Sequence, residues 1–182
     1  MPSWIVAQPV EYTDAADVLT VTAVEKSDFW RKTHYGFIHD DGHIYAEPLD
    51  GDFTLAVTFT ANYHNEYDQA GLMLWQDETT WVKTGIEFTE GRYFMSAVVT
   101  RDFSDWSVAA LPDDFDGALR ISLKRMGADI EIRYQIPGTE GWTLFRLAPF
   151  STAPTLQGGR MVCAPTAAGL HATFTDYTIT RG

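Results

Sequence analysis

The sequence has little of several features that define common protein classes. Its single cysteine, Cys163, cannot form an internal disulfide and suits a reducing compartment. No apolar run approaches the ~20 residues of a membrane span, and residues 1–12 lack the basic stretch of a secretory signal. Lysine and arginine number only 13, against 25 aspartates and glutamates, for a net charge of −12. These features predict a cytoplasmic protein that binds neither nucleic acid nor a membrane surface, because such a charge repels phosphates.

Motifs of covalent catalysis and cofactor binding are also missing. The chain has no Gly-x-Ser-x-Gly nucleophile elbow, no phosphate-binding loop and no dinucleotide fingerprint, and nothing marks Cys163 as an activated thiol. His39 and His43 could approach each other across a turn at 40–42, but a metal site would need a third ligand. Acidic turns such as 50–52 lack the ligand ladder of a calcium-binding loop. We therefore expect no metal site and no cofactor.

The composition that is present is typical of a globular β protein. The 182 residues can bury about 70% of the unfolded chain's surface, so one domain spanning residues 1–182 needs no disulfide or metal. Apolar and polar residues alternate, as in half-buried strands, in segments 53–60, 68–75, 81–88, 119–124 and 129–134. Turn residues separate the strands at 40–42, 50–52, 90–91, 127–128 and 137–138. Helical periodicity is nearly absent, with at most a short turn near 14–17. The pattern predicts an antiparallel β-sandwich, and the turn at 40–42 predicts a tight hairpin.

Two neighbouring predicted strands have an unusual second face. One face of segment 68–75 is apolar, and the other carries Gln69, Gly71, Met73 and Trp75. The equivalent face of segment 81–88 carries Trp81, Lys83, Gly85 and Glu87. If the two segments pair as a hairpin, the glycines open a hollow between polar and aromatic side chains. Such a surface suits a sugar-sized ligand, unless a loop or the N-terminal segment covers the rings.

Five blocks of the sequence resemble a known family. They are segments 28–30, 67–73, 81–88, 96–100 and 104–107. In this order and spacing they are similar to the regulation-of-enolase-protein family, a domain of unknown function in the concanavalin A-like lectin/glucanase superfamily. The resemblance covers nearly the whole chain and implies a jelly-roll sandwich of two curved antiparallel sheets, with any ligand on the concave face. It implies no established activity, and it leaves open a structural calcium ion, which such folds sometimes carry.

The function that these observations favour is non-catalytic binding of a carbohydrate or other hydroxylated small molecule. Tryptophan rings would stack on the ligand, and polar side chains would bind its hydroxyl groups. The candidate binding residues are Trp30, His34, Gln69, Trp81, Lys83, Glu87, Arg101, Asp105 and Trp106. No catalytic residue is assigned, although Glu87 is a weak candidate.

Three alternatives remain open at this stage. A glycan-active enzyme would use Glu87 as acid or base, but that residue has no second carboxylate on its own strand. Lys83 could bind a carboxylate, as in a uronic acid, or form a cross-strand ion pair with Asp68 or Asp105. The same aromatic residues could instead contact a protein partner or a second copy of the chain. We expect a monomer or a homodimer.

Overall fold

The computed structural model describes residues 1–182 and contains strands and turns but no helix. Sheet A has the strand order β1 (Ser3–Trp4), β6 (His43–Asp50), β15 (Thr155–Cys163), β8 (Asp68–Asp77), β9 (Thr80–Thr89), β10 (Arg92–Arg101), β11 (Phe103–Ala110). Sheet B has the order β14 (Thr143–Pro149), β13 (Asp129–Gln135), β12 (Leu119–Met126), β7 (Phe53–Ala61), β16 (His171–Arg181), β3 (Val18–Thr22), β2 (Glu11–Ala15). A small third sheet pairs β4 (Phe29–Arg31) with β5 (Ile38–Asp40). The strands within each sheet pair antiparallel, and the predicted all-β sandwich is confirmed.

Strand β7 illustrates how the sequence builds the layer between the sheets. Phe53, Leu55, Val57 and Phe59 are each at most 2% exposed, whereas the residues between them are partly exposed. This is the alternation expected of a strand that buries one face. Equivalent positions on both sheets join them in a core of 33 buried residues. Burial of this apolar surface is the main force that holds the sheets face to face.

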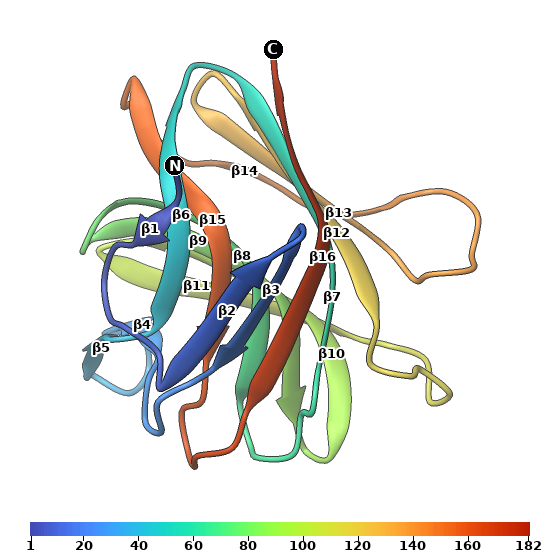
Figure 1. Cartoon of the computed structure of the whole chain (residues 1–182). Coiled ribbons are helices and arrows are strands. Elements are labelled where there is room, and N and C mark those ends of the chain that lie inside the picture. The colour runs from blue at the N-terminus through green and yellow to red at the C-terminus, as the bar shows by residue number, and fades with distance from the viewer.

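A second, smaller core lies on the outer face of sheet A. Residues 27–42, here called the strap, contain β4 and β5 and cross this face. Figure 1 shows the β4–β5 hairpin at the side of the sandwich remote from β12 and β16. Phe29 and Trp30 of the strap belong to a cluster of nine buried residues, which also includes Met73, Trp81 and Val98 of sheet A. The strap is therefore part of the folded body of the protein.

The path of the strap corrects the predicted hairpin at 40–42. Strand β5 pairs with β4 and not with β6. The backbone N–H groups of Asp41 and Gly42 each donate to the carbonyl of Asp28 at 3.1 Å. A side chain at Gly42 would collide with the ring of Phe29, 2.2 Å away, so this glycine allows the strap to close over the sheet. The short turn near 14–17 is likewise the tight connection between β2 and β3, with no helical residue.

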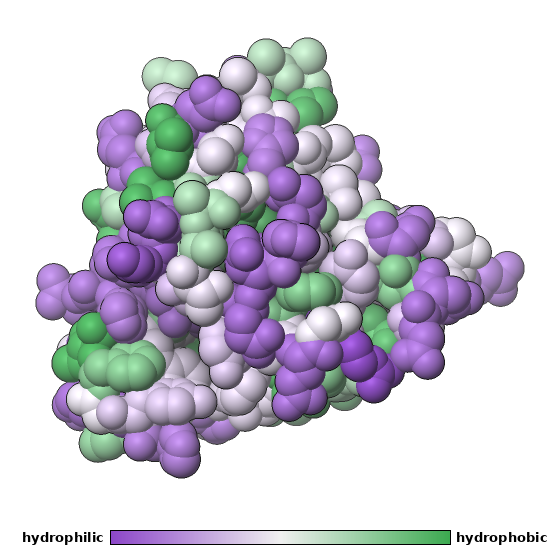
Figure 2. Space-filling model, turned by 90° about the horizontal axis from the view of Figure 1, so that it is seen from below, coloured by the Kyte–Doolittle hydropathy of each residue, from purple (hydrophilic) through white to green (hydrophobic).

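On the face of the molecule seen from below, hydrophilic side chains are the most numerous, and apolar ones gather most densely toward one side (Figure 2). None of the structure's secondary-structure elements is a helix long and apolar enough to cross a bilayer.

Candidate functional site

Strands β8 and β9 form the floor of the site. The two strands pair as the predicted hairpin, with Gly71 opposite Gly85 and Gln69 opposite Glu87. A Cβ atom on Gly71 would lie 2.0 Å from the carbonyl oxygen of Thr84, so neither strand can carry a larger residue here without moving. The two glycines thus keep the strands close and leave the outer face of the sheet bare at this point.

A pocket of ≈ 290 Å³ lies between the strap and the outer face of sheet A, and neither Gly71 nor Gly85 is among its lining residues. Sheet A contributes Gln69, Lys83, Glu87, Val98 and Trp106. The strap contributes Asp28, Trp30, Tyr35, Phe37 and His39. The remaining lining residues are Lys26, Tyr67, Pro165 and Thr166. The volume is close to the lower end of the range of about 300–1,000 Å³ for ligand pockets, which suits a small molecule.

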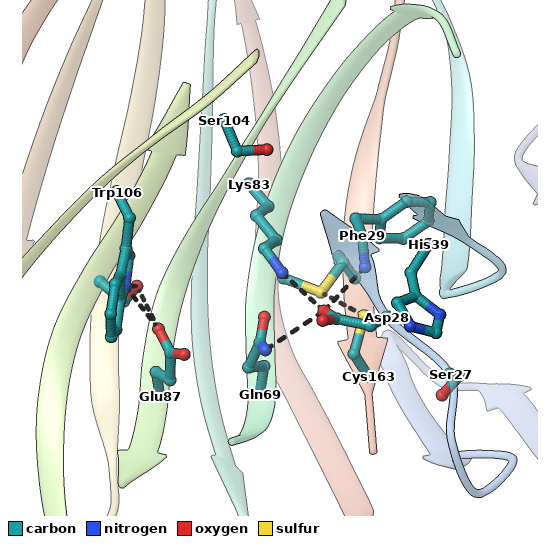
Figure 3. A network of polar contacts seen from close by, with 12 residues as sticks. Ser27, Asp28, Phe29, His39, Gln69, Lys83, Glu87, Ser104, Trp106 and Cys163 are labelled. Atoms are coloured by element: carbon teal, nitrogen blue, oxygen red, sulfur yellow. Dashed lines mark hydrogen bonds and ion pairs between the residues drawn. The ribbon is translucent and has the colours of Figure 1, made fainter. Parts of the chain in front are cut away.

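A nearly buried ion pair links the floor to the strap. Lys83 Nζ donates to Asp28 Oδ1 at 2.8 Å, with side-chain exposures of 5% and 18% (Figure 3). Gln69 Nε2 donates to the same oxygen at 3.4 Å. Burial alone would lower the pKa of Lys83, but Asp28, Cys163 and Glu87 together more than offset this and raise the pKa above its ordinary value. The lysine is therefore charged at neutral pH, and its charge is balanced before any ligand arrives.

This pair overturns the predicted partners of Lys83. Asp68 points into the sandwich, where its carboxylate accepts the backbone N–H groups of His64 and Asn65 at 3.0 and 2.8 Å. Asp105 pairs instead with Arg146 at 2.7 Å. The partner that sequence reasoning missed is Asp28, although a lysine on a buried face requires a counter-charge from somewhere in the fold.

Glu87 is the second charged group of the floor and is 5% exposed. Its Oε2 accepts hydrogen bonds from Ser96 Oγ at 2.6 Å and from Trp106 Nε1 at 2.9 Å (Figure 3). Burial raises the pKa of this carboxyl, and Lys83 and the two hydrogen bonds only partly oppose the shift. Both bonds end on Oε2, which leaves Oε1 for a group that enters the pocket.

Aromatic side chains form the opposite wall. The rings of Trp30 and Tyr35 lie 5.7 Å apart, and those of Trp30 and Trp106 lie 6.4 Å apart and nearly perpendicular, at 89°. Tyr35 and Phe37 stack at 5.2 Å. A polar floor facing an aromatic wall can bind a molecule that has both hydroxyl groups and an apolar face.

The pocket brings together much of the predicted binding set. Trp30, Gln69, Lys83, Glu87 and Trp106 all line it. Strand alternation placed the three polar residues correctly on the outer face of sheet A. Sequence reasoning missed several members of the lining, including Asp28, Tyr35 and Tyr67. Asp28 and Tyr67 belong to blocks that carried the family resemblance, and this was the available signal.

The prediction that Trp81 stacks on a ligand is wrong. Trp81 points to the outer face as expected, but it is 0% exposed because Phe29 of the strap covers it, with ring centroids 5.8 Å apart. It belongs to the smaller core and not to the pocket. The alternative in which a segment of the chain covers these rings therefore holds for Trp81, whereas Lys83 and Glu87 remain beside an open pocket.

The other candidates lie outside this pocket. Arg101 is exposed on the face opposite to its buried neighbour Thr100, and it lines neither this pocket nor the hollow beside it. His34 and Asp105 border that neighbouring hollow. Asp105 follows Ser104, whose side chain is buried, and its own carboxylate is held by Arg146 of sheet B. Segment 100–107 contains the tight turn between β10 and β11, since β10 ends at Arg101 and β11 begins at Phe103.

The histidines do not assemble a metal site. His43 is completely buried, accepts the backbone N–H of Val24 at 3.0 Å and contacts the carbonyl of Ala7 at 3.2 Å. His39 lies apart from it, on the wall of the pocket. The structure contains no group of three or more His, Cys, Asp or Glu side chains arranged to hold a metal ion.

Comparison with known proteins now places the chain. A family model described as "Protein of unknown function (DUF1349)" matches residues 4–182. The chain belongs to this family. It is 36% identical, over 95% of its own length and 86% of the relative's, to "Regulation of enolase protein 1" of Saccharomyces cerevisiae. The resemblance inferred from the sequence blocks is therefore confirmed.

Solved structures agree with this assignment. A functionally unknown protein from Saccharomyces cerevisiae matches with a TM-score of 0.94 and 33% identity, over 100% of this chain and 96% of that one. The carbohydrate-binding module CBM66 from Bacillus subtilis matches with a TM-score of 0.62 and 12% identity, over 97% and 94% of the two chains. At that identity the second match concerns the fold alone, and it confirms the predicted jelly-roll architecture.

Proposed function

We propose that the protein binds a carbohydrate, or another small molecule rich in hydroxyl groups, in the pocket between the strap and sheet A, and that it does so without catalysis. The observation that supports this most directly is the convergence of Gln69, Lys83 and Glu87 on a pocket with an aromatic wall. The predicted cytoplasmic location is part of the same proposal.

The hydrogen-bonding groups of the floor match hydroxyl groups well. Glu87 offers Oε1 as an acceptor, and Gln69 uses only its Nε2 within the protein, so its carbonyl oxygen is a second acceptor. Lys83 donates one of three N–H groups to Asp28 and has others to offer. A hydroxyl group both donates and accepts, so it can use this mixed set. The fold is also that of one protein named as a carbohydrate-binding module.

The proposal is tested by titrating a panel of neutral monosaccharides and oligosaccharides, with calorimetry and tryptophan fluorescence as readouts. Tyr35→Ala removes one ring of the aromatic wall. The Tyr35 side chain is 52% exposed, so the fold should tolerate the change. We expect the affinity to fall at least about tenfold, which corresponds to roughly 1.4 kcal/mol. Trp142→Ala, an aromatic position outside the pocket lining, is the matched control and should bind normally. Absence of binding to the whole panel, or equal loss in both variants, would refute the proposal.

A glycan-active enzyme is the second candidate, and one observation favours it. Asp28 supplies the second carboxylate that Glu87 lacks on its own strand, and both line the same pocket. Burial raises the pKa of Glu87, whereas the carboxylate of Asp28 is paired with the ammonium group of Lys83. An acid and a carboxylate in different environments are the basis of glycoside hydrolysis. Turnover of an aryl glycoside that Glu87→Gln abolishes at unchanged melting temperature would favour this candidate; equal turnover in the variant would exclude it.

A regulatory contact with another protein is the third candidate. One relative is named for the regulation of enolase, and the strap exposes Tyr35, Phe37 and Ile38 beside the pocket. Such exposed apolar residues can serve a protein interface. Two results together would remove this candidate. Light scattering would show a strict monomer, and any protein found to bind the chain would bind Ile38→Ser equally well.

A further inference from the structure

A second hollow adjoins the pocket on the outer face of sheet A. Its volume is ≈ 530 Å³. It shares Trp30, Tyr35 and Trp106 with the pocket, and it adds Thr33 and His34 from the strap. The two hollows are therefore neighbours that share an aromatic boundary.

The tryptophan pair in this boundary is held firmly. Trp30 Nε1 donates to the carbonyl of Thr33 at 3.1 Å, and Trp106 Nε1 donates to Glu87 at 2.9 Å. Each indole N–H is thus engaged within the protein, and the rings meet edge-on at 6.4 Å. Fixed rings present their apolar surfaces at little conformational cost to a ligand that contacts them from either hollow.

The two hollows differ in chemistry. The pocket has nearly buried polar side chains at its base, among them Lys83 and Glu87. The second hollow has no equivalent group: the hydroxyl of Ser104 is already used by the backbone N–H of Arg31 and by Thr100, each at 2.9 Å. Its lining is largely exposed; Trp30, Tyr35 and Trp106 are its aromatic members, and its carboxylate, Asp105, is paired with Arg146. One hollow is therefore equipped to select a unit by hydrogen bonds, and the other to accept a neighbouring unit by stacking.

We propose that the two hollows are consecutive subsites for the end of an oligosaccharide. The terminal unit occupies the pocket over Gln69, Lys83 and Glu87, and the next unit lies beside Trp106, Tyr35 and His34 in the second hollow. The inference rests on the proposed function and narrows its ligand from any hydroxylated molecule to a chain of at least two sugar units.

The test compares mono-, di- and trisaccharides of the gluco-, xylo- and fructo-oligosaccharide series by calorimetry. Within the series that binds, we expect the disaccharide to bind about tenfold more tightly than the monosaccharide, the scale of one aromatic stacking contact. The trisaccharide should add little more. Equal affinity for mono- and disaccharide would overturn the inference and leave the proposed function intact, whereas no binding by any series would overturn the proposed function itself.

Variants separate the two subsites. His34 has a left-handed backbone conformation, with φ of 63°, so His34→Gly removes the imidazole without adding strain. Thr33→Phe instead fills the second hollow. Each should abolish the disaccharide advantage and leave monosaccharide affinity unchanged. Gln69→Ala should weaken both ligands equally, and Asp17→Gly, an exposed position with φ of 67° in the β2–β3 turn, should change neither. A disaccharide advantage that survives both strap variants would contradict the assignment.

Discussion

Glu87 connects one residue's environment to the pH dependence of stability. Burial raises its pKa above the ordinary value of 4.5. At pH values between 4.5 and the raised pKa, the folded protein therefore holds a proton that the unfolded chain has lost. The free energy of unfolding contributed by this group therefore falls as pH rises through that window. Glu87→Gln cannot lose a proton, so the melting temperature of the variant relative to the wild type should increase across the window and be flat outside it. A relative melting temperature that decreases with pH would mean a depressed pKa.

Trp81 separates what alternation can and cannot predict for one side chain. The spacing of the strand correctly predicted its face, because successive residues in a strand point in opposite directions. Its cover comes from Phe29, distant in sequence, and no local pattern specifies that contact. Trp81→Ala should therefore leave a cavity and cost about 3–5 kcal/mol of unfolding free energy in urea titrations. Trp142→Ala, at a partly exposed position, should cost no more than about 0.5 kcal/mol. Similar losses in the two variants would count against burial under the strap.

The strap and sheet A are coupled as elements by the Lys83–Asp28 pair. Loss of one partner leaves a largely buried charge uncompensated, so Lys83→Met and Asp28→Asn should each cost about 3 kcal/mol of unfolding free energy. The double variant should cost clearly less than the sum, and denaturant titration of the four proteins gives the coupling energy. Arg92→Met breaks an exposed pair with Asp113 and should cost at most about 1 kcal/mol. Additive effects at Lys83 and Asp28 would show that the strap is not tied to the sheet in this way.

At the scale of elements, the sequence was informative where a strand repeats its alternation over many residues. Segments 53–60, 119–124 and 129–134 each became a strand in the predicted orientation, because one buried face fixes which residues point inward. Strands β4 and β5 have three residues each, too few for alternation to identify their partner. The turn at 40–42 therefore predicted the wrong pairing, and of the strap residues that line the pocket only Trp30 was predicted. The floor of the site was predictable from local pattern, and most of its wall was not.

At the scale of the molecule, the net charge of the chain and the charge balance inside the pocket both bear on the choice of ligand. The protein carries a net charge of −12, and the pocket lining contains two carboxylates, Asp28 and Glu87, and two lysines, Lys26 and Lys83. Because Asp28 balances Lys83 within the structure, the lysine has little net attraction left for an incoming anion. This weakens the earlier option of a uronic acid and favours a neutral ligand.

The comparison of a neutral sugar with the uronate of the same sugar tests this electrostatic argument. At low ionic strength we expect the neutral sugar to bind several-fold more tightly, because the negative field of the protein repels the carboxylate. The difference should shrink as salt increases from 10 to 150 mM, since the screening length falls from about 30 Å to about 8 Å. Calorimetry of both sugars at each salt concentration measures it, and an uncharged deoxy sugar controls for the loss of a hydroxyl group. Tighter binding of the uronate would mean that Lys83 leaves Asp28 to meet the ligand, and the charge balance of the pocket would then have to be reassigned.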